Sequence, residues 1–353
     1  MGSETIKPFK KTNISNMQQV NISGAKTSMR TRIRLYQKRA KEIERYLSKH
    51  PNEWGKFQNE FNAEVNGIFR EIMDYEKSQL SHGNHKKAQS LRDFFIRNFK
   101  ESFYVGDFCR WSVDKPFGYP GDFKIIYDIY LNSPKTCGFE RLFDNYFQMS
   151  AIAVAVRNRK GDLKRIITDH ISKTNSPSIR IMNLASGSAK EIHELFLEEK
   201  LNENVSIDCF DHDARALNFS KELLSRITTV KFFKKNALRI AAARDVLDVI
   251  PGRYDVIYSA GLFDYLGHTT AVSLCKNLGK ILTPGGLLLI ANVRDKYSNP
   301  SVHFMEWVGD WNLIYRDEEE FLKIFTDAKF KKADVKICYE QQGILQYAMI
   351  LKN

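Results

Sequence analysis

From residue 179 onward, short apolar runs alternate with stretches of helical pattern, and this alternation limits the possible fold more than any other feature. Strands that alternate with helices form a mainly parallel sheet covered by helices on both faces. The last two runs are joined by one loop without a helix, so we expect an antiparallel hairpin at one edge. The runs are IRIMNL (179–184), VSIDCF (205–210), VKFF (230–233), YDVIYSA (254–260), GLLLIANV (286–293), KADVKICY (332–339) and LQYAMILK (345–352).

The first half of the chain has the pattern of an all-helical domain. One apolar stripe with steps of three and four predicts a helix that Asn52 would cap. A second stripe follows the break SHGNH (81–85), and later helices are expected over 139–173 with a break near 160–162. The first stripe comprises Trp54, Phe57, Phe61, Val65, Ile68, Ile72 and Tyr75, and the second Leu91, Phe94, Phe95, Phe99 and Phe103.

These patterns divide the chain into three parts. Residues 1–27 are polar and lack a period, so we expect a poorly ordered basic arm. Residues 28–174 form the predicted helical domain, which could act as a lid or substrate domain, and 175–353 form the α/β domain. Residues 1–50 contain 12 basic and 3 acidic residues. This positive charge could bind nucleic acid, or it could simply be exposed to solvent.

Composition indicates a globular chain without a membrane span. Apolar residues make up 43% of the sequence, and no apolar run approaches the roughly 20 residues of a membrane helix. The N-terminus lacks the apolar segment of a secretory signal, so we predict a cytoplasmic protein. The five cysteines are scattered without a CxxC pair, which indicates reduced thiols and no metal site.

The stretch NLASGSAKE (183–191) follows the first predicted strand and could be a cofactor loop or an ordinary turn. Gly187 would let the backbone approach a ligand closely. Asp211 ends the second predicted strand, 24 residues later, close to the roughly 20 expected between a glycine loop and a carboxylate that binds ribose. Asp211 could instead cap the next helix, but Asp213 is better placed for that role.

At these positions the sequence resembles the class I S-adenosylmethionine-dependent methyltransferases, over roughly residues 175–353. Their first motif is acidic–aliphatic–Gly–x–Gly–x–Gly, where this chain has Asn183, Ala185, Gly187 and Ala189 at the acidic and the three glycine positions. The resemblance implies a Rossmann-like seven-stranded sheet and S-adenosylmethionine as cofactor, with S-adenosylhomocysteine as product.

Further motifs follow in the order of that family. KKNALRI (234–240) matches the loop beside the adenine, YDVIYSA the fourth strand, and LTPGG (282–286) the turn before the fifth. The resemblance implies that an arginine of MSAIAVAVRNR (149–159) binds the cofactor's carboxylate, and the apolar neighbours of Arg157 favour it over Arg159. The implied cofactor-binding residues are therefore Arg157, Asn183, Ala185, Ser186, Gly187, Asp211, His212, Asn236, Ala237 and Ser259.

The acceptor side is less well defined. KPFGYPGD (115–122) resembles a stretch of bacterial hydroxy-fatty-acid methyl ester synthase-like proteins, and Tyr119 and Asp122 could line the acceptor pocket or serve only a helix entry. An aromatic-rich connector (294–320) is expected to shape specificity in this fold, with Tyr297, Trp311 and Arg316 as candidates to bind the acceptor. Tyr265 could form the pocket wall and His303 could act as a base, although a lone histidine is more often structural.

We therefore expect an enzyme that transfers a methyl group to oxygen or nitrogen of a small or medium-sized acceptor, free or carrier-bound. Hydroxy or fatty acids and natural-product carboxylates or amines fit this expectation. Two alternatives stay open: a nucleic-acid methyltransferase that uses the basic arm, and a non-catalytic binding protein that keeps the fold. The first is disfavoured because SAGLFDYL (259–266) lacks the Asn-Pro-Pro-Tyr pattern used on base amines.

Overall fold

The computed structural model describes residues 21–353 apart from 175, 199–200, 202–203 and 251, and it divides them into two compact units. One is a helical unit and the other an α/β unit, and each is built from separate stretches of chain. The helical unit includes Pro300–Asn312, and the α/β unit includes Asp122–Leu131 and Ala151–Asn299. The predicted boundary near 174 differs from this division, because the α/β unit also contains segments before residue 174 and the helical unit also contains Pro300–Asn312.

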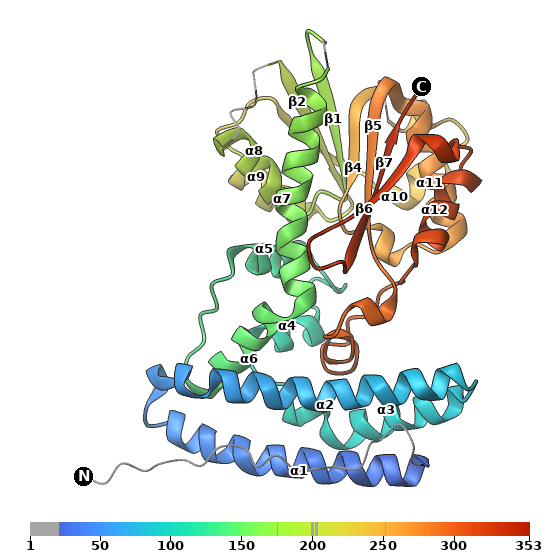
Figure 1. Cartoon of the computed structure of the whole chain (residues 1–353). Coiled ribbons are helices and arrows are strands. Elements are labelled where there is room, and N and C mark those ends of the chain that lie inside the picture. Colours follow the sequence, from blue (N-terminus) through green and yellow to red (C-terminus); the bar gives the residue numbers. More distant parts are fainter. Residues whose placement is uncertain (1–20, 175, 199–200, 202–203, 251) are drawn as a thin grey trace. The chain divides into compact units, whose positions relative to one another are not determined.

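The α/β unit is built on a seven-stranded sheet of order β3-β2-β1-β4-β5-β7-β6 (Figure 1). The first five strands are parallel, and β7 runs antiparallel to both β5 and β6. The predicted Rossmann-like sheet with an antiparallel edge hairpin is confirmed. The strands are β1 (Ile179–Leu184), β2 (Val205–Asp211), β3 (Val230–Lys234), β4 (Tyr254–Ser259), β5 (Leu282–Val293), β6 (Val335–Tyr339) and β7 (Leu345–Leu351).

Helices cover both faces of this sheet, as Figure 1 shows. On one face Leu163, Ile166 and Ile192 pack against β1 and β2, and on the other Leu274 and Ile324 join the core. The first group comprises α7 (Ala151–Ile171), α8 (Lys190–Glu198) and α9 (Ala214–Leu223). The second comprises α10 (Ala237–Ala242), α11 (His268–Ile281) and α12 (Glu318–Asp327). Single turns are η4 (Val246–Asp248), η5 (Phe263–Tyr265), η6 (Lys296–Ser298) and η8 (Lys332–Asp334).

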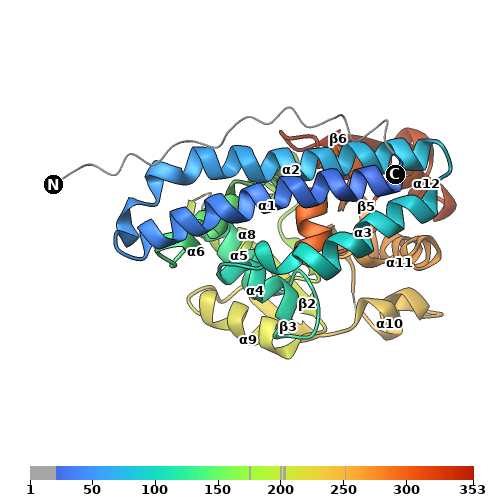
Figure 2. The same ribbon diagram turned by 90° about the horizontal axis from the view of Figure 1, so that it is seen from below.

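The helical unit has an aromatic core. Its long helices α1, α2 and α3 lie side by side in Figures 1 and 2 and pack around Phe61, Phe69 and Phe95. Phe304, from the C-terminal half of the chain, packs against Phe69 at 5.5 Å between ring centroids. The elements are α1 (Ile22–Leu47), η2 (Pro51–Glu53), α2 (Gly55–Ser81), α3 (His85–Phe99), η3 (Lys100–Ser102), α4 (Asp107–Asp114), α6 (Gly138–Met149) and the π-helical turn η7 (Phe304–Val308).

Three local predictions were wrong. Asn52 lies within η2, and α2 begins at Gly55 without a side-chain cap. The helix break expected near 160–162 falls at Ser150 instead, because α7 keeps Val156 and Leu163 on one buried face through this stretch. Residues 1–20 of the expected arm lie outside the described residues, but Ile22 already begins α1, capped by the side chain of Asn21.

Candidate functional site

The loop after β1 turns through three residues with left-handed backbone conformation. Ala185, Gly187 and Ala189 have φ of 57°, 53° and 50°. Glycine adopts this region readily, whereas it costs other residues about 1 kcal/mol. The two alanines thus occupy the positions where the methyltransferase motif has glycine, and the loop adopts glycine-type geometry without those glycines.

Asp211 ties this loop to the end of β2. Its Oδ2 accepts a hydrogen bond from the backbone N–H of Gly187 at 2.9 Å, and its Oδ1 accepts one from Asp213 at 2.9 Å. The backbone N–H of Ser186 donates to the carbonyl of Phe210, which joins the tips of β1 and β2. A carboxylate accepts about four hydrogen bonds, so Asp211 keeps acceptor capacity for a ligand.

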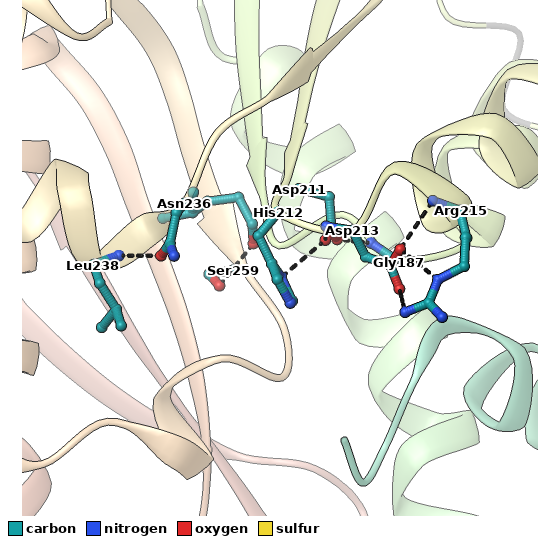
Figure 3. A network of polar contacts seen from close by, with 9 residues as sticks. Gly187, Asp211, His212, Asp213, Arg215, Asn236, Leu238 and Ser259 are labelled. Carbon is teal, nitrogen blue, oxygen red and sulfur yellow. Dashed lines mark hydrogen bonds and ion pairs between the residues drawn. The ribbon is translucent and has the colours of Figure 1, made fainter. Parts of the chain in front are cut away.

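Other predicted cofactor residues lie at the neighbouring strand ends, and Figure 3 shows them around Asp211. His212 is exposed, and its hydrogen bond with Asp211 raises the pKa of the imidazole. Asn236 caps α10 through the N–H of Leu238 at 2.8 Å, directly before buried Ala237. Ser259 is fully buried and donates to the carbonyl of Leu184, a contact between β4 and β1.

Position in the sheet supports a ligand site here. Strand β1 lies between β2 and β4, so the strand order reverses at the β1–β4 pair. In open α/β sheets, ligands bind outside the carboxyl ends of the strands at such a switch point. Loop 185–189, Asp211 and Ser259 all lie at these carboxyl ends.

Arg159, not Arg157, is the buried arginine of α7, and this corrects the sequence-based preference. Arg159 is 4% exposed because it lies one turn from Ala155 and Leu163 on the buried face, whereas Arg157 is half-buried. Burial lowers the pKa of Arg157. Arg159 donates to the carbonyl of Ala260, just after β4, at 2.9 Å, and its buried Nε has no hydrogen-bond partner.

Helix α5 (Phe123–Leu131) covers the loop within the same unit. Phe123 contributes the nearest atoms to Gly187, since a Cβ built on that glycine would lie 3.8 Å from the Phe123 Cβ. Phe219 of α9 packs against Phe123 and Tyr127 with ring centroids 5.3 and 4.9 Å apart. Tyr130, from the end of α5, lies with its hydroxyl 3.4 Å from Nη2 of Arg159.

Asn183 is part of a buried polar group that the sequence did not reveal. Its Nδ2 donates to Oε1 of Glu191 at 3.0 Å, and the Tyr258 hydroxyl donates to the same oxygen at 2.9 Å. All three side chains are buried, and burial is the main cause that raises the pKa of Glu191. The spacing of Arg159 from the apolar residues of α7 could have indicated from the sequence that it is buried. Glu191 and Tyr258 have no such signal, because their patterns are shared by any helix and strand.

Two of the predicted acceptor residues in the α/β unit serve the fold. Asp122 is buried and caps α5, because its Oδ1 accepts from the N–H groups of Lys124 and Ile125 at 2.8 and 3.0 Å. Arg316 is 4% exposed and donates to the Phe263 carbonyl and Asn292 Oδ1 at 2.8 and 2.6 Å. These contacts fix the loop after β4 and leave little of Arg316 for an acceptor.

Tyr265 and Tyr297 stay accessible in the α/β unit. Tyr265 is 38% exposed at the end of η5, directly after β4. Tyr297 is half-buried in η6, after β5. Both follow the carboxyl ends of central strands, where this fold binds its ligands.

The remaining acceptor candidates, Tyr119, His303 and Trp311, belong to the helical unit. Tyr119 is half-buried in a turn, and Trp311 is 8% exposed. His303 is fully buried, with Nε2 2.9 Å from Oε2 of Glu76 and its ring against Trp307. Full burial and the contact with Glu76 indicate a structural role for His303, which differs from the catalytic base expected from the sequence.

The helical unit also has a cavity of about 780 Å³, beside α1 and the start of α6. Apolar side chains including Leu47, Val105 and Phe139 line it, together with charged groups such as Lys41 and Glu44. None of the residues predicted to contact the acceptor lies in its wall.

No helix in the described part of the chain is long and apolar enough to cross a membrane. Within the same residues, no cluster of three or more His, Cys, Asp or Glu side chains could hold a metal ion.

The geometry thus defines a Rossmann-like α/β unit whose glycine-type loop and neighbouring acid lie at the sheet's switch point. Solved structures share this fold. A possible exported protein from Bordetella parapertussis aligns over 96% of this chain and 99% of its own, with a TM-score of 0.53 and 14% identity. At that identity the likeness shows the fold.

Two solved methyltransferases also align. The CurJ carbon methyltransferase has a TM-score of 0.49 at 14% identity and covers 89% of this chain and 70% of its own. Magnesium protoporphyrin IX methyltransferase (ChlM) from Synechocystis PCC 6803, solved with bound SAM, has a TM-score of 0.44 at 10% identity over 65% of this chain and 90% of its own. No protein-family model matches the sequence, and no curated protein matches it.

Proposed function

We propose that the chain is an S-adenosylmethionine-dependent methyltransferase that acts on oxygen or nitrogen of a small or medium-sized acceptor. The main support is the hydrogen bond from the N–H of Gly187 to Asp211, because it joins the residue that matches the family's ribose-binding acid to the loop that matches its first motif. The later motifs of the same family follow in order along the chain.

The side chains at this site fit the cofactor. Asp211 would accept hydrogen bonds from the ribose hydroxyls, and Asn236 and Ala237 would lie at the adenine, as the resemblance implies. The absence of a side chain at Gly187 leaves the backbone open to a close approach. Arg159 would hold the carboxylate of the amino-acid group, because its buried Nε has no partner in this structure.

Bound S-adenosylmethionine supplies a methyl group on a sulfonium sulfur, already activated for transfer. The protein's part is then to orient the acceptor and exclude water. A base is needed only where the acceptor keeps its proton at working pH. Tyr265 and Tyr297 are the candidates to contact the acceptor, and the resemblance of KPFGYPGD supports hydroxy and fatty acids as the first acceptors to test.

The test is calorimetric titration of S-adenosylmethionine and S-adenosylhomocysteine into the intact chain and into Asp211→Ala. We expect the intact chain to bind both, and the variant to bind them roughly 100-fold more weakly, because charge-assisted hydrogen bonds to two hydroxyls are lost. Asp213→Ala is the matched control. It removes a carboxylate two residues away that caps α9 through the N–H of Arg215, and it should bind normally.

Failure of the intact chain to bind either compound would contradict the proposal. Binding without turnover on any acceptor would favour a non-catalytic protein that keeps the fold. Turnover on nucleic acid but not on small molecules would favour the alternative based on the basic arm.

A further inference from the structure

Glu191 places a buried carboxylate next to the proposed cofactor loop. It is 5% exposed and lies in the first turn of α8, two residues after Ala189. Its Oε1 accepts hydrogen bonds from Asn183 at the end of β1 and from Tyr258 of β4. The carboxylate is therefore held by one side chain from each of the two adjacent strands at which the sheet order reverses.

Neither of the two hydrogen-bond donors to Glu191 has a charge. In residues 21–353, outside the few undescribed positions, no lysine, arginine or histidine forms an ion pair with it. Glu194, one turn further along α8, pairs with Lys160, Lys164 and Lys190 instead. Burial of an unpaired carboxylate is costly, so this arrangement favours a cation that arrives with a ligand.

A buried cation that forms no ion pair with any described residue lies in the same unit, although the charge of Asp264 also acts on it. Arg159 is 4% exposed, and it donates hydrogen bonds to the Ala260 carbonyl and the Tyr130 hydroxyl, neither of which is charged at neutral pH. The charges of Glu191 and Arg159 both act on Tyr130, and each acts on the other. The site thus offers one negative and one positive group, neither of which forms an ion pair within the described residues.

We propose that Glu191 binds the α-ammonium group of the cofactor while Arg159 binds its carboxylate, so that the amino-acid end is held as a zwitterion. This inference rests on the proposed function. The ligand class is an α-amino acid group, which S-adenosylmethionine and S-adenosylhomocysteine share. Glu191 is here a binding and positioning residue, since it fixes the cofactor's end and takes no part in bond breaking.

The same arrangement explains the departure of the first motif from its family pattern. Asn183 stands where that motif has an acid, and an amide cannot supply negative charge. In this chain Asn183 donates to Glu191, so the acid comes from α8, eight residues later in the sequence.

The experiment compares three compounds by calorimetry: S-adenosylhomocysteine, its analogue that lacks the α-amino group, and S-adenosylmethionine. The variant is Glu191→Gln, whose side-chain carbonyl can still accept from Asn183 and Tyr258. We expect Glu191→Gln to bind S-adenosylmethionine and S-adenosylhomocysteine about 10- to 100-fold more weakly than the intact chain, and the deaminated analogue with unchanged affinity. Glu194→Gln, on the same helix, is the matched control and should leave all three affinities unchanged.

Every other outcome contradicts either the assignment of Glu191 or the proposed function. If Glu191→Gln weakens all three compounds equally, or none, Glu191 has no role at the ammonium group. If only S-adenosylmethionine is affected, the carboxylate acts on the sulfonium instead, and the assignment is wrong. If the intact chain binds none of the three, the proposed function itself fails, a result distinct from failure of the Glu191 assignment alone.

Discussion

At the scale of single residues, the loop after β1 keeps alanine at two positions where the backbone favours glycine. Ala185 and Ala189 have φ of 57° and 50°. We expect Ala185→Gly to raise the free energy of unfolding by about 0.5–1 kcal/mol, because release of the left-handed penalty outweighs the extra freedom of glycine in the unfolded chain. Urea unfolding followed by circular dichroism measures the difference.

Ala214→Gly provides the control for that substitution. Ala214 is exposed and begins α9 in right-handed helical conformation, so glycine there should lower stability. Equal losses of stability at both positions would show that the backbone at 185 imposes no penalty on alanine.

Glu191 makes stability depend on pH in a specific direction. Burial is the main cause that raises the pKa of its carboxyl in the folded chain. Its protonated form is therefore favoured by folding, and the stability associated with it is complete below the unfolded pKa, near 4.3, and is lost as pH rises through the folded value. Glu191→Gln cannot ionise, so we expect its melting temperature to exceed that of the intact chain by more at pH 8 than at pH 5.

Calorimetric melting of both proteins across this range checks the direction. A difference in melting temperature that shrinks as pH rises would contradict the effect of burial on Glu191. The expected gain in stability on loss of the charge is also consistent with a carboxylate kept for a ligand.

At the scale of elements, α5 depends on Asp122 for its start. Asp122 accepts from two backbone N–H groups of the first turn, and α5 in turn covers Gly187. We expect Asp122→Ala to cost about 1 kcal/mol of local stability, which corresponds to roughly five-fold faster amide exchange over Phe123–Leu131. Hydrogen-exchange mass spectrometry resolves this segment.

Asp122→Asn is the matched variant, because asparagine caps a helix about as well as aspartate. If amide exchange over α5 is normal in both variants, Asp122 is not needed as a cap, and the acceptor-binding role predicted from the sequence is favoured. Fast exchange in the alanine variant alone supports the cap.

Elements with long, regular patterns could be predicted from the sequence, and the contacts between them could not. Periodicity predicted the sheet, its edge hairpin and the long helices of the first half, because apolar spacing is a property of one segment at a time. The sequence predicted that Asp211 and Gly187 would lie near each other at one end of the sheet, but it did not predict the hydrogen bond between them. Arg159 was ranked below Arg157 because the ranking used only the apolar neighbours of Arg157 in the sequence and overlooked the helical face that Arg159 shares with Ala155 and Leu163.

At the scale of the whole molecule, the chain passes between the two units several times, and no local pattern marks those passages. They fall at Gly121, Leu131, Ser150, Asn299 and Asn312. Part of the connector expected to shape acceptor specificity, Pro300–Asn312, belongs to the helical unit. An aromatic-rich composition is typical of a pocket wall and of a hydrophobic core, so the sequence could not distinguish the two roles. The burial of the side chains in the structure is what distinguishes them.

This exchange of segments predicts that a substitution near residue 307 destabilises helices more than 200 residues earlier in the sequence. Trp307 is 1% exposed, and its ring centroid lies 5.5 Å from that of Phe95 in α3. We expect Trp307→Ala to cost about 3–5 kcal/mol and to speed amide exchange across α2 and α3. Leu278→Ala, fully buried in α11 of the α/β unit, is the control and should speed exchange in α11 first. Unchanged protection of α2 and α3 in Trp307→Ala would mean that these helices form their core without Pro300–Asn312, and the helical unit would then be independent of the C-terminal half of the chain.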